Sequence, residues 1–186
     1  MTTVFLSGSR KISRINDAIR QRIDNMVEQD FNIVVGDANG ADKAMQAYLA
    51  EIRYSHVTVF YVGEKSRNNV GDWRSENVAV PGNLTGRDFY TVKDKEMAQR
   101  ADFGLVLWDG KSSGSVANVL EMLKFGKKIV VYFAPDKMFY TVSSEDDARR
   151  LIGKCDSDAI SEIGRKVKLT GALREISQNR QNSLAL

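Results

Sequence analysis

Short apolar, β-branched runs alternate along this chain with segments that carry an apolar residue every three or four positions. Such runs are typical of strands buried on both faces, and the spacing between them is typical of amphipathic helices. The alternation predicts an α/β fold: a Rossmann-like parallel sheet of about five strands with helices on both faces. The five runs cover residues 4–6, 31–35, 57–62, 103–108 and 128–133.

Segments with helical periodicity lie between these runs. Ser13 is the expected N-cap of the first, Thr91 with Asp94 caps the third, and Gly126 ends the fourth. Residues 63–90 show no period, and a structureless connection of this length is usually functional or mobile. The four helices are expected over residues 12–26, 41–52, 91–101 and 114–125.

The chain beyond Pro135 has a different pattern, which turns helical. Ser143 or Ser144 is expected to cap a helix over residues 145–152, and a weaker helix is expected within residues 156–176. The last ten residues look frayed. We therefore expect a Rossmann-like domain over residues 1–134 and a C-terminal helical extension with a basic, frayed tail over residues 135–186.

The charge distribution bears on possible partners. The net charge is +3, and residues 165–186 hold five Lys or Arg against one Glu, which leaves the remainder near neutral. A basic tail can touch nucleic acid, but this one lacks the aromatic residues that stack on bases. Nucleic-acid binding is therefore the less favoured expectation.

Cys155 and His56 are the only cysteine and the only histidine. They allow no intramolecular disulfide and no zinc-binding set, so we expect neither a metal nor another cofactor. Residues 1–8 lack the basic segment and the long apolar run of a signal peptide, and no stretch reaches the roughly 18 apolar residues of a membrane span. A cytoplasmic protein without a membrane partner is expected.

Three strand-to-helix turns are rich in glycine and serine. Ligands of open α/β sheets bind beyond the carboxyl ends of the strands, where helix N-termini offer free N–H groups. In the first turn, Gly8 and Ser9 allow close approach of an anion, and Arg10 adds a guanidinium. The dinucleotide fingerprint Gly-x-Gly-x-x-Gly is absent.

The second turn spans residues 36–42. Gly36 and Gly40 permit positive φ, and Asp42 falls in the first turn of the following helix. An acid there stabilises the helix by about 0.3–1 kcal/mol. It can equally accept hydrogen bonds from ligand hydroxyls, and both roles stay open.

The third turn follows the most apolar run. A P-loop is excluded because Leu105 stands where that motif needs its first glycine. The turn still offers several hydroxyl and N–H groups, which suit one phosphate. Its expected ligand-binding residues are Gly110, Lys111, Ser112, Ser113, Gly114 and Ser115.

The three turns, taken in order, resemble the SLOG superfamily, which includes the LOG nucleotide phosphoribohydrolases and the DNA-processing protein A domain. The likeness is to its small stand-alone branch and covers residues 3–134. It implies binding of a nucleotide or nucleotide-derived ligand in the crevice. It places at the ligand Gly8, Ser9, Arg10, Gly36, Gly40, Asp42, Gly114 and Ser115.

The LOG enzymes and the similar nucleoside deoxyribosyltransferases have a glutamate four residues after the glycine of their Gly-Thr turn. Asn118 stands there in this chain, and an amide is neither a nucleophile nor a proton donor near neutral pH. Asp109 and Glu121 are the candidate replacements. A second interpretation of Asp109 is that it bonds its own backbone, and Glu121 lies about 4.5 Å deeper along the helix axis.

The weaker likeness to deoxyribosyltransferases rests on an Arg-Asp stretch that lines their nucleoside pocket. It implies that Arg87, with Asn118, lies at the ligand. Trp73 is open to two interpretations, a base-stacking platform or a hydrophobic anchor. Arg67 and Arg74 beside it are equally open.

The leading hypothesis is binding or sensing of a phosphorylated nucleoside or an ADP-ribose-like compound. The alternative is an N-glycosidic hydrolase or transferase acting on nucleosides or nucleoside 5′-monophosphates. Further alternatives are a nucleic-acid accessory protein and a carrier of a small anion or of molybdenum cofactor. A homo-oligomer is expected, since Rossmann-like domains of this size often pair through their helices.

Overall fold

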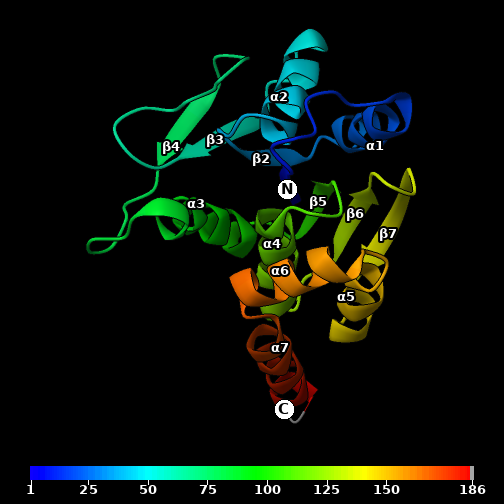
Figure 1. Ribbon diagram of the computed structural model, residues 1–186. Helices are drawn as coiled ribbons and strands as arrows, with labels where there is room; N and C mark the ends of the chain where they lie inside the picture. The colour runs from blue at the N-terminus through cyan, green and yellow to red at the C-terminus, as the bar shows by residue number, and fades with distance from the viewer. Residues whose placement is uncertain (185–186) are drawn as a thin grey trace.

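The computed structural model describes residues 1–184 and contains one mostly parallel seven-stranded sheet (Figure 1). The strands are β1 (Thr3–Gly8), β2 (Asn32–Gly36), β3 (Val57–Tyr61), β4 (Arg74–Asn77), β5 (Phe103–Trp108), β6 (Ile129–Phe133) and β7 (Met138–Val142). Their order is β4-β3-β2-β1-β5-β6-β7, and only β7 runs antiparallel to its neighbour. The strand order reverses between β1 and β5, which pair at the centre of the sheet.

Helices cover both faces of the sheet, as predicted. Alternate residues of each strand point to opposite faces, so Phe5 packs in one apolar cluster while Val4 and Leu6 pack in the other. Helices α1 and α2 cover one face, and α3 to α7 contribute to the other. The helices are α1 (Asp17–Glu28), α2 (Ala41–Glu51), α3 (Gly86–Arg100), α4 (Ser113–Lys124), α5 (Glu145–Ile152), α6 (Ser157–Val167) and α7 (Leu169–Leu184).

All five predicted strands are present, but two short edge strands were missed. The segment 63–90 is not structureless, because it holds β4 and the start of α3. The four residues of β4 include no apolar side chain, so this strand leaves no hydrophobic signal. Strand β7 lies beyond Pro135, where a helical pattern was predicted, and Met138 at its start is 56% exposed.

Two predicted helix starts are wrong. Helix α1 begins at Asp17 rather than near residue 12, and its N-cap is Asn16, whose side chain accepts a hydrogen bond from the Ile19 N–H at 3.0 Å. Ile12 and Ile15 still pack against the core, but from the loop before the helix. Helix α3 begins five residues before Thr91. The prediction placed its start too late because the first turns have no apolar stripe that could mark them.

The C-terminal extension is more ordered than predicted. Ser144, one of the two predicted caps, accepts a hydrogen bond from Asp147 N–H and starts α5. The expected weak helix is a pair, α6 and α7, separated by Lys168. Leu173 and Ile176 of α7 are buried in the core, and the helix continues to Leu184; residues 185–186 of the expected frayed tail lie outside the described part.

The described part of the chain has no helix that combines the length and the apolarity needed to span a bilayer. The division expected after residue 134 falls between β6 and β7, which pair along their full length. Helices α5, α6 and α7 all contact α4, so the extension packs on the helix that follows β5.

Candidate functional site

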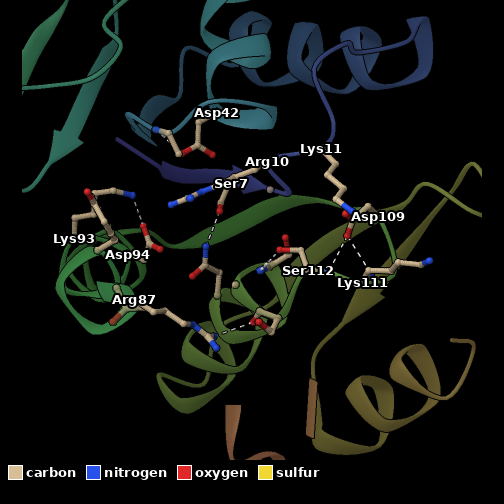
Figure 2. A pocket seen from close by; sticks show the side chains of 18 of the residues that line it. Ser7, Arg10, Lys11, Asp42, Arg87, Lys93, Asp94, Asp109, Lys111 and Ser112 are labelled. Carbon is tan, nitrogen blue, oxygen red and sulfur yellow. Dashed lines mark hydrogen bonds and ion pairs between the residues drawn. The ribbon is translucent and has the colours of Figure 1, made fainter. Parts of the chain in front are cut away.

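The three glycine- and serine-rich turns meet at the carboxyl edge of the sheet. They follow β1, β2 and β5, which are neighbours, and they surround a cavity of about 600 Å³ (Figure 2). The convergence expected from the sequence is therefore present. The predicted residues that line this cavity are Gly8, Arg10, Asp42, Arg87, Asp109, Lys111, Ser112, Ser113, Gly114, Ser115 and Asn118.

Ser9 does not reach the cavity, because it is fully buried beneath it. Its hydroxyl donates to Oδ1 of Asp109 at 3.0 Å and shares a second hydrogen bond, also of 3.0 Å, with the hydroxyl of Ser115. The backbone N–H of Asp109 in turn donates to the Ser9 hydroxyl. Ser9 therefore joins the first turn to the third and holds both turns in place beside the cavity.

Three predicted glycines also support the cavity from behind. A Cβ on Gly40, whose φ is +87°, would collide with the backbone of Arg10. A Cβ on Gly36 would lie 2.5 Å from Oδ2 of Asp42 and 2.8 Å from Nζ of Lys93. Gly110, with φ of +77°, turns against Phe133. A larger residue at Gly36 would displace Asp42 and Lys93, which line the cavity, and one at Gly40 would displace the backbone of Arg10.

The carboxylate of Asp109 is engaged within its own turn. Its Oδ1 accepts hydrogen bonds from the backbone N–H of Lys111 at 3.0 Å and of Ser112 at 2.7 Å, besides the bond from Ser9. The structure thus bears out the interpretation that Asp109 bonds its own backbone. These contacts hold the third turn in the shape that opens α4.

Helix α4 points its N-terminus at the cavity. Ser112 caps it by accepting a hydrogen bond from the Ser115 N–H at 3.4 Å. The N–H groups of Ser113 and Gly114 belong to the first turn, where a helix has no internal acceptor for them. These N–H groups and the positive end of the helix dipole are a favourable site for an anion.

Asn118 lies one turn further along α4 and is 7% exposed. Its Nδ2 donates to the hydroxyl of Ser7 at 2.6 Å, and both residues line the cavity. The amide therefore ties α4 to β1. Glu121, the other candidate carboxylate, lines an adjacent smaller cavity and lies 3.9 Å from Lys124 in an ion pair.

The most unusual group in the cavity is a buried lysine between two acids, which the sequence analysis missed. Lys93, from α3, is 3% exposed, and its Nζ contacts Oδ1 of Asp94 at 2.6 Å. Burial alone would lower the pKa of Lys93, but the carboxylates of Asp94 and Asp42 outweigh it and the pKa is raised. Figure 2 shows Lys93 and Asp94 side by side, with Asp42 on the neighbouring element.

Asp42 is 5% exposed, and its one hydrogen bond within the described chain runs to Oδ2 from the Ala38 N–H at 3.3 Å. Burial raises the pKa of Asp42 to about 7, because the opposing charge of Lys93 does not compensate for the lost hydration. Oδ1 of Asp42 thus remains available to a ligand. An acid with this pKa can also exchange a proton near neutral pH.

A second missed feature closes the cavity on the side of the segment 63–73. Arg67 holds Asp37, which is 1% exposed, through its Nε at 2.9 Å and its Nη2 at 2.5 Å. Burial would raise the pKa of Asp37, but the bonds from Arg67 lower it overall. The Arg67 guanidinium also lies 4.5 Å from the ring centre of Tyr90, and that of Arg10 lies 6.0 Å from it.

Trp73 and Arg74, whose roles the sequence left open, contact other parts of the molecule. Trp73 donates from Nε1 to the carbonyl of Tyr54 at 2.8 Å and packs against the core, as a hydrophobic anchor does. Arg74 is exposed and pairs with Glu76 at 3.2 Å. Neither lines the cavity.

Arg87 joins three helices across the mouth of the cavity. It extends from the first turn of α3 and donates to the carbonyl of Ser113 and to that of Lys166, both at 3.1 Å. Figure 2 shows the bond to α4. The site therefore depends on the C-terminal extension as well as on the sheet.

Basic side chains outnumber acidic ones around the cavity, six to four. The basic residues are Arg10, Lys11, Arg67, Arg87, Lys93 and Lys111, and the acidic ones are Asp42, Asp94, Asp109 and Glu162. Within residues 1–184, no group of three or more His, Cys, Asp or Glu side chains is placed to hold a metal ion. The lining thus combines cationic groups with a buried acid.

Comparisons with models of protein families, with curated proteins and with solved structures find no match for the chain.

Proposed function

We propose that this cavity binds a nucleotide or a nucleotide-derived ligand. The observation that carries the proposal is the arrangement of the cavity ends: the α4 N-terminus on one side and the buried Asp42 on the other (Figure 2). A phosphate suits the free N–H groups of Ser113 and Gly114. Oδ1 of Asp42 suits a sugar hydroxyl, which needs an acceptor.

The size and lining of the cavity support this proposal. A volume of about 600 Å³ lies within the range of roughly 300–1,000 Å³ that small-molecule sites occupy. Arg10 is exposed and lines the cavity, so its guanidinium can add a charge-assisted bond to phosphate. Tyr90 also lines the cavity, where its ring packs against the Arg67 guanidinium at 4.5 Å and holds that cation at the site.

The first experiment is mass spectrometry of small molecules released when the purified protein is denatured. The second is calorimetry with the four ribonucleoside 5′-monophosphates, each compared with its nucleoside. We expect saturable binding of at least one monophosphate. Its nucleoside, which lacks the charged group, should bind more weakly by about tenfold or more.

Arg10→Ala should weaken monophosphate binding by about tenfold, because one charge-assisted bond is lost. Arg14→Ala is the matched control, since Arg14 is exposed in the same loop and does not line the cavity. If no monophosphate binds to the unaltered protein and denaturation releases no nucleotide, the proposal is wrong.

Hydrolysis of an N-glycosidic bond is the second candidate function, and Asp42 is the observation that favours it. The carboxylate of Asp109 already accepts three hydrogen bonds, and Glu121 lies outside the cavity. We therefore place the candidate catalytic carboxylate at Asp42. It would take a proton from the water that attacks the sugar C1′, while the C1′–N bond breaks and its electron pair leaves with the base, which then takes up a proton from solvent as Asp42 returns its own to solvent.

Chromatography of nucleoside 5′-monophosphates incubated with the protein tests this candidate. Free base should accumulate with time, and Asp42→Asn should abolish its release while leaving binding measurable. Asp72→Asn serves as the control, because Asp72 is exposed and does not line the cavity. Binding without release of base would exclude hydrolysis and leave the binding proposal intact.

A further inference from the structure

Lys93 brings a buried cation with unused hydrogen-bond donors to the large cavity, the one of about 600 Å³. An ammonium group has three N–H donors. Within residues 1–184, the one hydrogen bond from Nζ of Lys93 runs to Oδ1 of Asp94 at 2.6 Å. The other donors are therefore left for a ligand. Because a buried donor without an acceptor is costly, this end of the cavity is suited to an oxygen atom of the ligand.

Two carboxylates flank this lysine. Asp94 also lines the large cavity, its side chain is 22% exposed, and its Oδ2 has no hydrogen bond in the described part of the chain. A Cβ on Gly36 would lie 2.5 Å from Oδ2 of Asp42 and 2.8 Å from Nζ of Lys93, so these two groups converge above the glycine. Figure 2 shows Lys93, Asp94 and Asp42 together at one end of the cavity, away from Ser112 at the start of α4.

An ammonium group between two carboxylates discriminates among the polar groups of a ligand. A phosphate offers only acceptors, and its charge is repelled by both acids. A hydroxyl group donates and accepts, so it can bond to Lys93 and to one carboxylate at the same time. Two hydroxyls on neighbouring carbons can use both carboxylates, with the ammonium group between them. The geometry is thus complementary to a vicinal diol.

We infer that Lys93, Asp42 and Asp94 recognise the 2′- and 3′-hydroxyls of a ribose, and that the site thereby distinguishes ribonucleotides from deoxyribonucleotides. One hydroxyl donates to Oδ1 of Asp42, the other donates to Oδ2 of Asp94, and Nζ of Lys93 donates to the hydroxyl oxygens. This inference rests on the proposed function. The resemblance does not decide the sugar, because it extends both to phosphoribohydrolases and to deoxyribosyltransferases.

Calorimetry with AMP, GMP, CMP and UMP, each against its 2′-deoxy and its 3′-deoxy counterpart, tests the inference. Each deoxy compound should bind about 10- to 100-fold more weakly than the ribonucleotide, because the missing hydroxyl leaves a buried charged group without its partner. A deoxy compound that binds as tightly as its ribonucleotide overturns the inference and leaves the proposed function intact. Absence of binding by all the compounds overturns the proposed function as well.

Asp94→Asn tests the part played by Asp94. The variant keeps an oxygen for the bond from Lys93 but replaces Oδ2 with an amide group that donates. It should weaken ribonucleotide binding by about tenfold and leave one of the two deoxy compounds unchanged, because that compound lacks the hydroxyl that Oδ2 accepts.

Asp88→Asn is the matched control, since Asp88 is an exposed acid of the same helix and does not line the large cavity. It should leave all affinities unchanged. Weakening of the ribonucleotide and of both deoxy compounds by the same factor in Asp94→Asn contradicts the inference, because a purely structural role has that effect. Thermal melting checks that both variants are folded.

Discussion

The side-chain amide of Asn118 donates a hydrogen bond to the hydroxyl of Ser7 across 2.6 Å, and both residues are more than nine-tenths buried. The bond joins α4 to the central strand β1 at the floor of the large cavity. Removing one partner of a buried polar pair leaves the other without a hydrogen bond, which lowers the stability of the fold.

Asn118→Leu should therefore destabilise the protein by about 1–3 kcal/mol, because the Ser7 hydroxyl, which is 5% exposed, loses its partner. Urea denaturation measures the change. Asn25→Leu, at an exposed position of α1, should change the free energy of unfolding by no more than about 0.5 kcal/mol. A similar small effect at Asn118 would show that water reaches Ser7.

The pKa of Asp42, about 7, predicts an unusual dependence of stability on pH. Between its ordinary value of 3.8 and about 7, the folded protein keeps a proton that the unfolded chain has lost. Raising the pH through this window therefore removes stability. Asp42→Asn has no such proton to lose.

We expect the stability of Asp42→Asn, relative to the unaltered protein, to rise across this window and to level off above it. Urea denaturation at a series of pH values measures the difference, and Asp72→Asn is the matched control. A difference that stays constant across the window would mean that Asp42 is ionised throughout.

Substitution of two glycines by alanine should have opposite effects. A Cβ on Gly36 would press on Asp42 and Lys93, so Gly36→Ala should cost about 1–3 kcal/mol and weaken ligand binding. Gly164 lies inside α6 with nothing within 4 Å of its added Cβ, so Gly164→Ala should stabilise by about 0.5–1 kcal/mol. Thermal and urea denaturation of both variants measures the two opposite changes in the free energy of unfolding.

Arg67→Ala should loosen the segment that closes the cavity. It leaves the carboxylate of Asp37 buried without its cation, at a cost of about 1–3 kcal/mol, less than for a fully enclosed pair because the Arg67 side chain is 32% exposed. Limited proteolysis within residues 63–73 should become faster. Arg74→Ala, which alters an exposed pair, should leave the cleavage rate unchanged.

Much of the sheet could be predicted because its inner strands are continuous apolar runs. The edge strand β4 could not, since Arg74 to Asn77 read as a polar loop and gain strand structure only by pairing with β3. Strand β7 is a different case: Met138 to Val142 are apolar or β-branched residues typical of a strand, and the strand was missed because the chain beyond Pro135 was predicted to be helical.

The three turns of the site could also be predicted, because glycine and serine after an apolar run mark a strand-to-helix turn. Lys93 could not be found in this way. A lysine in a helix ordinarily faces solvent, and only the fold brings α3 beside the end of β2, where Lys93 meets Asp42 above Gly36. Asp94 was predicted to cap this helix with Thr91, which is wrong, because α3 begins at Gly86 and Asp94 pairs with Lys93.

Strand β1 bonds to β2 on one side and to β5 on the other, although β5 begins about a hundred residues later in the chain. During synthesis, the first half of the protein can therefore form only one flank of the cavity. A nascent or truncated chain that ends before α4 would present the arginines without the helix that completes their site. A slow folding step is expected at this long-range closure.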